Sequence, residues 1–194
     1  DTIQSLIKRY SLPLECKELQ CAMERVAKLL DQENIIAICT GCQEVGERAL
    51  GFRSILSLPS EDMRDQVNNR VKFRESWRPF APMILDSYMS SLFDIDRPEP
   101  FMTIVYPVSN HSSELAGIIH VDSTARLQTI SQKENPFIAG VLKILEDEFS
   151  RPPVIINTSY NVNGQSMVRN SYDALMTFMA SNIDYLLINN ILIK

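Results

Sequence analysis

Short apolar runs recur along this chain, and longer segments with helical periodicity separate them. The runs are too brief for ordinary helices and are apolar throughout, which predicts buried strands. They lie at residues 35–38, 154–156 and 185–188. The helical segments lie at residues 19–30, 136–149 and 171–181. Because buried strands that alternate with helices form α/β sheets, we expect an α/β (α+β) domain, with a sheet flanked by helices.

Weaker patterns predict further elements. Ser60, followed by two acidic residues, is a good N-cap for a helix that ends near residue 69. Strands are predicted at residues 71–75, 101–106 and 117–121. Pro79 and Pro82 limit the chain after the first of these strands to a loop or a short edge piece, because proline cannot donate to a sheet ladder.

Composition narrows the class of protein. The chain has 194 residues, and we expect residues 1–34 to form an N-terminal linker and helix that lead into a domain at residues 35–194. A net charge of −5 argues against a nucleic-acid or membrane-surface partner, since such proteins carry a broad basic face. No apolar run reaches the ~20 residues of a membrane span. Four cysteines confined to the first quarter favour reduced thiols and a cytoplasmic location. The absence of an initiator Met indicates a piece of a longer protein.

Residues 70–78 form a basic segment in this acidic chain. The segment holds four basic residues and one acid. In a strand, residues two apart share a face, so Lys72 and Arg74 would project side by side and repel one another. A bound anion would compensate, and phosphate suits because Arg offers a bidentate fork and Lys a point charge. The alternative is a solvated edge strand whose charges oppose aggregation.

A polar loop follows the apolar run at residues 154–156. Ser159 and Asn161 lie just beyond this predicted strand, where α/β sheets place their ligands. A hydroxyl and a carboxamide donate to phosphate oxygens without adding charge. An ordinary Asn/Ser turn is the alternative reading.

Two more stretches are rich in polar groups. Residues 44–54 place Arg48 and Arg53 beside glycines, which let a backbone approach a ligand closely. Residues 120–126 end a predicted strand with Asp122, for which we weigh a role in holding magnesium against one in orienting Arg126. A network of buried Asp–Arg pairs is the structural alternative.

These four stretches together resemble a known family. Residues 44–56 read EVGERALGFRSIL, 71–82 read VKFRESWRPFAP, 120–129 read HVDSTARLQT and 157–161 read NTSYN. In this order they resemble the C-terminal domain of the O-carbamoyltransferases that modify antibiotics and nodulation factors. That domain is similar to the YrdC-like fold, a twisted open mixed sheet. Its other members, the hydrogenase-maturation carbamoyltransferases and threonylcarbamoyl-adenylate synthases, carry K-x-R and S-x-N signatures. Here Lys72, Arg74, Ser159 and Asn161 match them.

The resemblance implies an enzyme domain that binds carbamoyl phosphate and ATP with Mg²⁺ and forms carbamoyl-adenylate. A separate N-terminal Kae1-like domain would then pass the carbamoyl group to an acceptor hydroxyl. The resemblance assigns carbamoyl phosphate and the catalytic contacts to Lys72, Arg74, Arg78 and Ser159, with Asn161 completing the cradle. The residues it implies for ATP are Arg48, Arg53, Thr124, Arg126 and Asn157. It implies no protein metal ligand.

Departures from the family pattern leave other functions open. Glu47, Phe52, Ser123 and residues 165–166 differ from the family's usual residues. Because Glu47 lies beside Arg48, we expect nucleotide binding to be less secure than carbamoyl phosphate binding. The alternatives are a non-catalytic nucleotide-binding or interaction module, and a threonylcarbamoyl-adenylate synthase that modifies tRNA.

Overall fold

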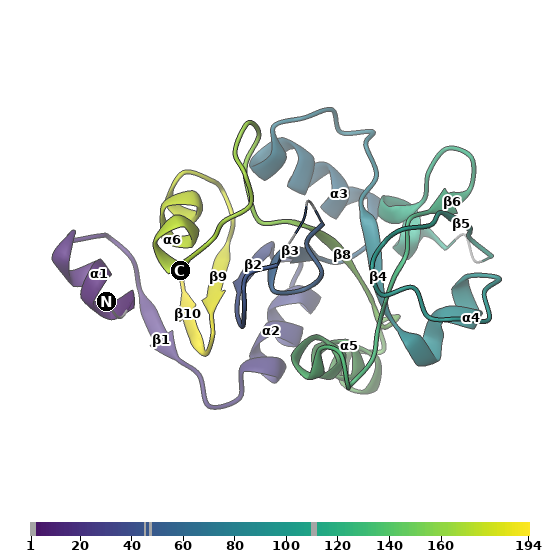
Figure 1. Cartoon of the computed structure of the whole chain (residues 1–194), viewed down its shortest axis with the longest axis horizontal. Coiled ribbons are helices and arrows are strands. Elements are labelled where there is room, and N and C mark those ends of the chain that lie inside the picture. Colours follow the sequence, from purple (N-terminus) through teal and green to yellow (C-terminus); the bar gives the residue numbers. More distant parts are fainter. Residues whose placement is uncertain (1–2, 45, 47, 110–111) are drawn as a thin grey trace.

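The computed structural model describes residues 3–44, 46, 48–109 and 112–194. These residues form one eight-stranded mixed sheet with the order β1-β10-β9-β2-β3-β8-β4-β7 (Figure 1). Its strands are β1 Cys16–Glu18, β2 Ile36–Cys39, β3 Arg53–Ser57, β4 Ala81–Leu85, β7 Gln128–Ile130, β8 Val154–Ser159, β9 Tyr185–Ile188 and β10 Ile191–Ile193. The pairs β2–β9 and β4–β7 are parallel, and the other neighbours are antiparallel. The α/β class and the mixed sheet expected from the sequence are confirmed.

Helices cover both faces of this sheet. They are α1 Ile3–Arg9, α2 Ala22–Asp31, α3 Glu61–Val67, α4 Met89–Leu92, α5 Pro136–Phe149 and α6 Ser171–Met179. Because side chains alternate along a strand, Ile36 and Ile38 pack with α2 and α5, whereas Ala37 and Cys39 pack toward α3 and α6. In Figure 1, α5 lies below the sheet and α3 above it. Each apolar strand therefore contributes to two hydrophobic cores, which explains why the runs are apolar throughout.

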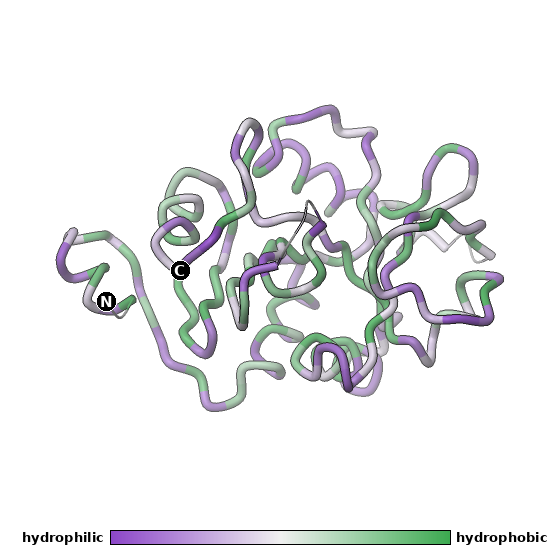
Figure 2. The backbone as a smooth tube through the Cα atoms, in the orientation of Figure 1, coloured by the Kyte–Doolittle hydropathy of each residue, from purple (hydrophilic) through white to green (hydrophobic). Residues whose placement is uncertain are grey.

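The helices begin where the sequence supplies caps. Ser60 accepts a hydrogen bond from the Met63 amide at the start of α3. Asn135 does the same for the Ile138 amide at 3.0 Å at the start of α5, where Pro136 takes the first helical position. The predicted helix at residues 136–149 is confirmed at both ends. Figure 2 shows hydrophobic segments along β9 and β10 and a hydrophilic turn between them.

The predicted strand at residues 71–75 is wrong. A π-helix, Asn68–Lys72, continues α3, and the chain then turns through Phe73, whose φ of 48° is left-handed. Residues 73–80 form a loop, which we call the basic loop, before β4 begins. Lys72 and Arg74 are therefore separated by a sharp turn instead of projecting side by side. A buried amide, Asn68, holds this turn, and nothing in a single sequence reveals that Asn68 is buried.

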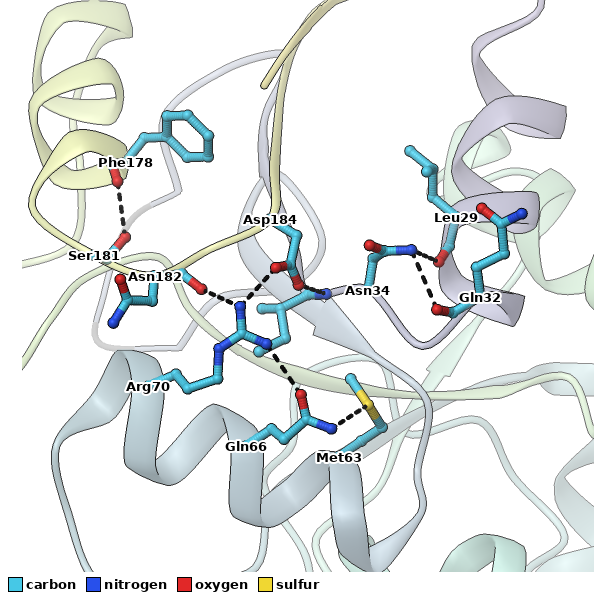
Figure 3. Close-up of polar contacts among 11 residues, drawn as sticks. Leu29, Gln32, Asn34, Met63, Gln66, Arg70, Phe178, Ser181, Asn182 and Asp184 are labelled. Atoms are coloured by element: carbon cyan, nitrogen blue, oxygen red, sulfur yellow. Dashed lines mark hydrogen bonds and ion pairs between the residues drawn. The ribbon is translucent and has the colours of Figure 1, made fainter. Parts of the chain in front are cut away.

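Arg70 lies in the same basic segment, and its side chain reaches toward Asp184 and Gln66 (Figure 3). Its guanidinium contacts Asp184 Oδ1 at 2.6 Å and Gln66 Oε1 at 3.0 Å, and the other carboxylate oxygen of Asp184 accepts from the Ile35 amide. Arg70 also donates to the carbonyl of Asn182 at 2.8 Å. Arg70 thus ties the helical turn to the starts of β2 and β9, and its charge is compensated within the fold.

Three other local predictions also differ from the structure. Only Tyr106 of the predicted strand at residues 101–106 is β-structure, as the start of β5 Tyr106–Pro107, which pairs with β6 Thr124–Ala125. The segment predicted as a strand at residues 117–121 instead ends a 3₁₀ helix, Ser113–Ile118. Pro82 lies inside β4 and pairs with Ile156 of β8, but the pairing of β4 with β7 begins only at Met83. Pro82 is thus tolerated because β4 has one partner at that position.

The N-terminal segment joins the same sheet. β1 pairs with β10 at one edge, and α2 packs against α5. The predicted boundary at residue 34 stays a prediction. Among the described residues, no helix is long and apolar enough to cross a membrane.

Candidate functional site

The candidate site lies at the carboxyl end of β8. Pairing with β4 reaches only as far as Ala81 opposite Asn157, while pairing with β3 continues to Ser54 opposite Ser159. The last residues of β8 therefore have a partner on one side, and the basic loop diverges on the other. This divergence opens a cleft at the strand end, where α/β sheets place their ligands.

Three adjoining cavities of about 380, 290 and 300 Å³ form this cleft, and Arg74 and Arg78 line all three. The first is also lined by Lys72, Ser159 and Asn161, the second by Arg48, Arg126, Asn157 and Ser159, and the third by Trp77, Val105, His120 and Arg126. We call the whole the basic cleft. Glu75 is the carboxylate among the residues that line these cavities. The cleft thus concentrates positive charge in a chain whose net charge is −5.

Lys72 is enclosed at one end of the basic cleft. Its ammonium donates to Asn161 Oδ1 at 2.9 Å, to the Asn161 carbonyl at 3.0 Å and to the Ser159 carbonyl, with Ser159 Oγ at 3.4 Å. The side chain is 7% exposed. Burial, and then the nearby charge of Arg74, lowers the pKa of Lys72 from 10.5 to about 7. With a pKa of about 7, Lys72 is close to half protonated at neutral pH, and the surrounding oxygens stabilise its ammonium form.

Ser159 and Asn161 form a small polar unit with Lys72. Ser159 Oγ donates to Asn161 Oδ1 at 2.7 Å, and Asn161 Nδ2 donates to the Gln165 carbonyl at 2.7 Å. The structure therefore brings together the K-x-R lysine and both S-x-N residues. It does so through a helix end and a strand end, and not through the basic strand that the sequence predicted.

Arg74 forms the middle of the basic cleft. Its Nε donates to Asn68 Oδ1 at 2.6 Å, and its guanidinium lies 4.4 Å from the centre of the Phe80 ring. Burial and the neighbouring Arg78 lower the pKa of Arg74 to about 10, so Arg74 stays cationic at neutral pH. Arg78 is half exposed, with Glu75 at 3.7 Å. Two cations held this close favour a shared anion.

Asn68 organises the basic loop and was missed by sequence reasoning. Its side chain is fully buried. While its Oδ1 holds Arg74, its Nδ2 donates to the carbonyls of Ser76 at 3.1 Å and Arg78 at 2.9 Å. One amide thus fixes both ends of the loop that carries the two arginines.

Arg48, Arg126 and Asn157 meet at the second cavity. Asn157 Nδ2 donates at 2.8 Å to the carbonyl of Ala49 and at 2.8 Å to Gln128 Oε1. Gln128 in turn donates to the Leu50 carbonyl. Asn157 therefore anchors the backbone next to Arg48, while its own buried Oδ1 has no hydrogen-bond partner among the residues that the structure describes.

Arg53 and Thr124 lie outside the lining of these cavities, as far as the described residues show. Arg53 is buried, and its guanidinium donates to the carbonyls of Thr40, Phe52 and Gly41. The Glu44 carboxylate accepts from the Arg53 amide at 2.9 Å and from the amides of residues 50 and 52. Arg53 thus stabilises the loop that carries Arg48. Glu47, whose charge was expected to weaken nucleotide binding, lies outside the described residues.

Thr124 and Asp122 belong to a turn at the edge of the third cavity. Thr124 Oγ1 contacts Asp122 Oδ1 at 2.6 Å and His120 Nδ1 at 3.0 Å. The hydrogen bond from Thr124 lowers the pKa of the exposed Asp122 carboxyl. In the part of the chain that the structure describes, no group of three His, Cys, Asp or Glu residues is placed to hold a metal ion.

The arrangement is suited to phosphoryl chemistry. Cationic side chains gather at a strand end, where burial and hydrogen bonds hold Lys72, and a hydrogen bond and a ring contact hold Arg74. Such groups stabilise negative charge that develops on phosphoryl oxygens without reorganising during the reaction. The cleft therefore predicts a ligand with more than one phosphate.

Comparisons with known proteins agree with this geometry. The family model described as "Carbamoyltransferase C-terminus" matches residues 27–194. Nodulation protein NolO of Bradyrhizobium diazoefficiens is 39% identical over 165 residues, covering 82% of this chain and 30% of NolO. The chain spans about a third of the length of the curated relatives it matches.

Solved structures share the fold at low sequence identity. A Sua5 variant of P. abyssi aligns with a TM-score of 0.60 at 15% identity, covering 87% of this chain and 48% of that one. Full-length HypF "in the phosphate- and nucleotide-bound form" aligns with a TM-score of 0.57 at 18% identity, covering 87% of this chain and 25% of HypF. These likenesses confirm the expected YrdC-like sheet.

Proposed function

The chain belongs to the carbamoyltransferase C-terminal family, and from this premise we propose that it binds carbamoyl phosphate and ATP and forms carbamoyl-adenylate. One observation carries the proposal: a continuous cleft in which Lys72, Ser159 and Asn161 occupy one end and Arg48 and Arg126 line the middle. Arg74 and Arg78 are common to both parts, so two phosphate-bearing ligands would meet beside them.

Carbamoyl phosphate would occupy the Lys72 end. Arg74 and Arg78 would bind its phosphate, and the ammonium of Lys72 would add a third positive charge. Ser159 and Asn161 would hold Lys72 and turn their polar groups to the carbamoyl end of the ligand. HypF, which shares this fold and whose structure is described as phosphate- and nucleotide-bound, supports the proposal that such a domain takes both kinds of ligand.

ATP would occupy the remainder of the cleft. Arg48 and Arg126 would contact its phosphates, and Asn157 would keep Arg48 in place through the Ala49 carbonyl. We propose that Arg53 and Thr124 act indirectly. Arg53 would stabilise the loop that carries Arg48, and Thr124 would orient His120.

The proposed reaction has two steps. Water first converts carbamoyl phosphate into carbamate and phosphate. A carbamate oxygen then attacks the α-phosphorus of ATP, forming carbamoyl-adenylate and releasing pyrophosphate. Both steps gather negative charge on phosphoryl oxygens, which the arginines stabilise. Mg²⁺ would arrive with ATP and neutralise the leaving pyrophosphate, since this ion is usually held by substrate phosphates and few protein ligands.

The acceptor is proposed to lie on another part of a larger protein. The curated relatives are about three times as long as the matched region, which leaves room for a Kae1-like domain. That domain would take the carbamoyl group from carbamoyl-adenylate.

The test follows pyrophosphate release from ATP and Mg²⁺ with and without carbamoyl phosphate. We expect release only with both substrates, and a loss of at least about 100-fold in Arg74→Ala, because one preorganised donor to a developing charge contributes about that much. Lys143→Ala, on the exposed side of α5, is the matched control and should be unchanged. Release with L-threonine and bicarbonate, but not with carbamoyl phosphate, would instead indicate a threonylcarbamoyl-adenylate synthase. Saturable ATP binding without release would indicate a non-catalytic module.

A further inference from the structure

Trp77 is the single tryptophan of the chain, and it is 70% exposed. It lies in the basic loop, between Arg74 and Arg78. Burial of a large aromatic side chain would stabilise the fold, and at this exposed position Trp77 does not contribute that free energy. No function proposed above uses it.

Trp77 lines the third cavity of the basic cleft. This cavity has a volume of about 300 Å³, and Val105 and His120 line it together with Trp77. Val105 is 47% exposed, so a second apolar surface is open to a ligand. The rest of the wall of the third cavity includes Arg74, Arg78 and Arg126, which also line the second cavity. An aromatic face, an apolar side chain and an imidazole thus adjoin a row of arginines.

His120 adds a directional group. Its Nδ1 lies 3.0 Å from Thr124 Oγ1, which fixes the ring, and Nε2 is the other ring nitrogen available to a ligand. Aromatic side chains stack on nucleobases because every base presents a π-face, and arginines bind the phosphates attached to it. Carbamoyl phosphate has no flat ring, so the third cavity does not suit it.

We propose that the third cavity is the nucleobase subsite, in which Trp77 stacks on the purine ring of ATP and His120 contacts the edge of the base. This inference rests on the proposed function, because it extends the same cleft from the phosphates to the base. ATP would then lie in the cleft with its base at Trp77 and its phosphates at Arg126 and Arg48, next to the arginines that it shares with carbamoyl phosphate. Its α-phosphate, which follows the ribose directly, would lie beside Arg74 and Arg78, which also line the carbamoyl phosphate end, and its β- and γ-phosphates would extend toward Arg48.

The fluorescence of Trp77 tests the subsite directly, because no other tryptophan contributes to the signal. ATP and inorganic tripolyphosphate, each with Mg²⁺, carry the same kind of phosphate chain, but only ATP has a base. We expect ATP to change the emission of Trp77 and to bind about 5- to 150-fold more tightly than tripolyphosphate, the range that one base stack supplies.

Calorimetry on two variants completes the test. Trp77→Ala should weaken ATP binding about tenfold and leave tripolyphosphate binding within about twofold, whereas Trp77→Phe should retain most of the ATP affinity. Tyr172, in α6, is an exposed aromatic residue that packs on Tyr10. Its replacement in Tyr172→Ala should change the affinity for neither ATP nor tripolyphosphate. Equal affinity for ATP and tripolyphosphate would overturn the subsite and leave the proposed function standing. It would also favour a protein-docking role for Trp77. Failure of both ligands to bind would overturn the proposed function together with the subsite.

Discussion

Anion binding by the basic cleft should depend on the protonation of Lys72. Burial and Arg74 lower the pKa of Lys72 to about 7, so about half of the side chains are charged at pH 7 and about 1% at pH 9. Only the ammonium form attracts an anion, whereas Arg74, with a pKa of about 10, stays mostly charged at pH 9. The affinity for an anion at the Lys72 end is therefore greatest below pH 7 and falls as the pH rises.

The magnitude follows from these fractions. If binding requires the ammonium and the bound anion keeps Lys72 protonated, the apparent Kd should weaken about 50-fold between pH 7 and pH 9, since the charged fraction falls by that factor. Sulfate is the best probe, because phosphate itself titrates in this range. Calorimetric titration with sulfate across this range measures the slope, and buffers with different ionisation enthalpies detect the proton taken up on binding.

Two variants isolate the contribution of Lys72. Lys72→Met should bind sulfate weakly and with almost no pH dependence, whereas Lys143→Met removes an exposed lysine and should behave as the wild type. A wild-type affinity that changes less than about twofold over the same range, or an equal slope in Lys72→Met, would show that Lys72 is not the titrating ligand.

The same pKa shift should affect stability in the opposite sense. The folded chain binds fewer protons than the unfolded chain between about pH 7 and 10.5, because the pKa of Lys72 is lower in the folded state. The free energy of unfolding should therefore rise with pH across this window in the wild type relative to Lys72→Met. Chemical denaturation at several pH values measures this difference.

Two further substitutions test the support of the cleft and the packing of the fold. Asn68→Ala should lower kcat for pyrophosphate release at least about tenfold while the chain stays folded, because the basic loop loses three hydrogen bonds from one buried amide; an unchanged kcat would exclude a positioning role. Gly117→Ala should destabilise the fold by about 2 kcal/mol or more in thermal or chemical denaturation, because its Cβ would clash with the backbone carbonyl of Ser60. Gly140→Ala is the matched control, because the atom that its Cβ would meet is the sulfur of the flexible Met23 side chain, and alanine favours the helix. A similar loss of unfolding free energy in both variants would contradict the explanation.

The sequence alone indicated the class of fold and the family, together with the basic residues that line the cleft. Apolar runs at residues 35–38, 154–156 and 185–188 lie in strands, because a run too short for a helix and apolar throughout suits a strand buried on both faces. The helix at residues 136–149 was predicted at both ends from its helical periodicity. These features depend on neighbouring residues, so they can be read locally.

Local patterns failed where long-range contacts decide the structure. Residues 71–75 alternate as a strand would, yet α3 continues into a π-helix because Asn68 is held by carbonyls eight and ten residues further along the chain. The edge strand β1 and the short β7 also escaped prediction, since their pairing with β10 and β4 joins distant segments.

The basic residues at 70–78 illustrate what the sequence could predict and what only the tertiary structure decided. Their types and number indicated an anion site, and the motifs they share with Ser159 and Asn161 indicated the family. Only the fold separated their roles, directing Arg70 to Asp184 and Lys72 to the end of β8. The physical reason is that a side chain's partner is set by backbone direction, and the turn at Phe73 is held by hydrogen bonds of the buried Asn68 that no local pattern encodes.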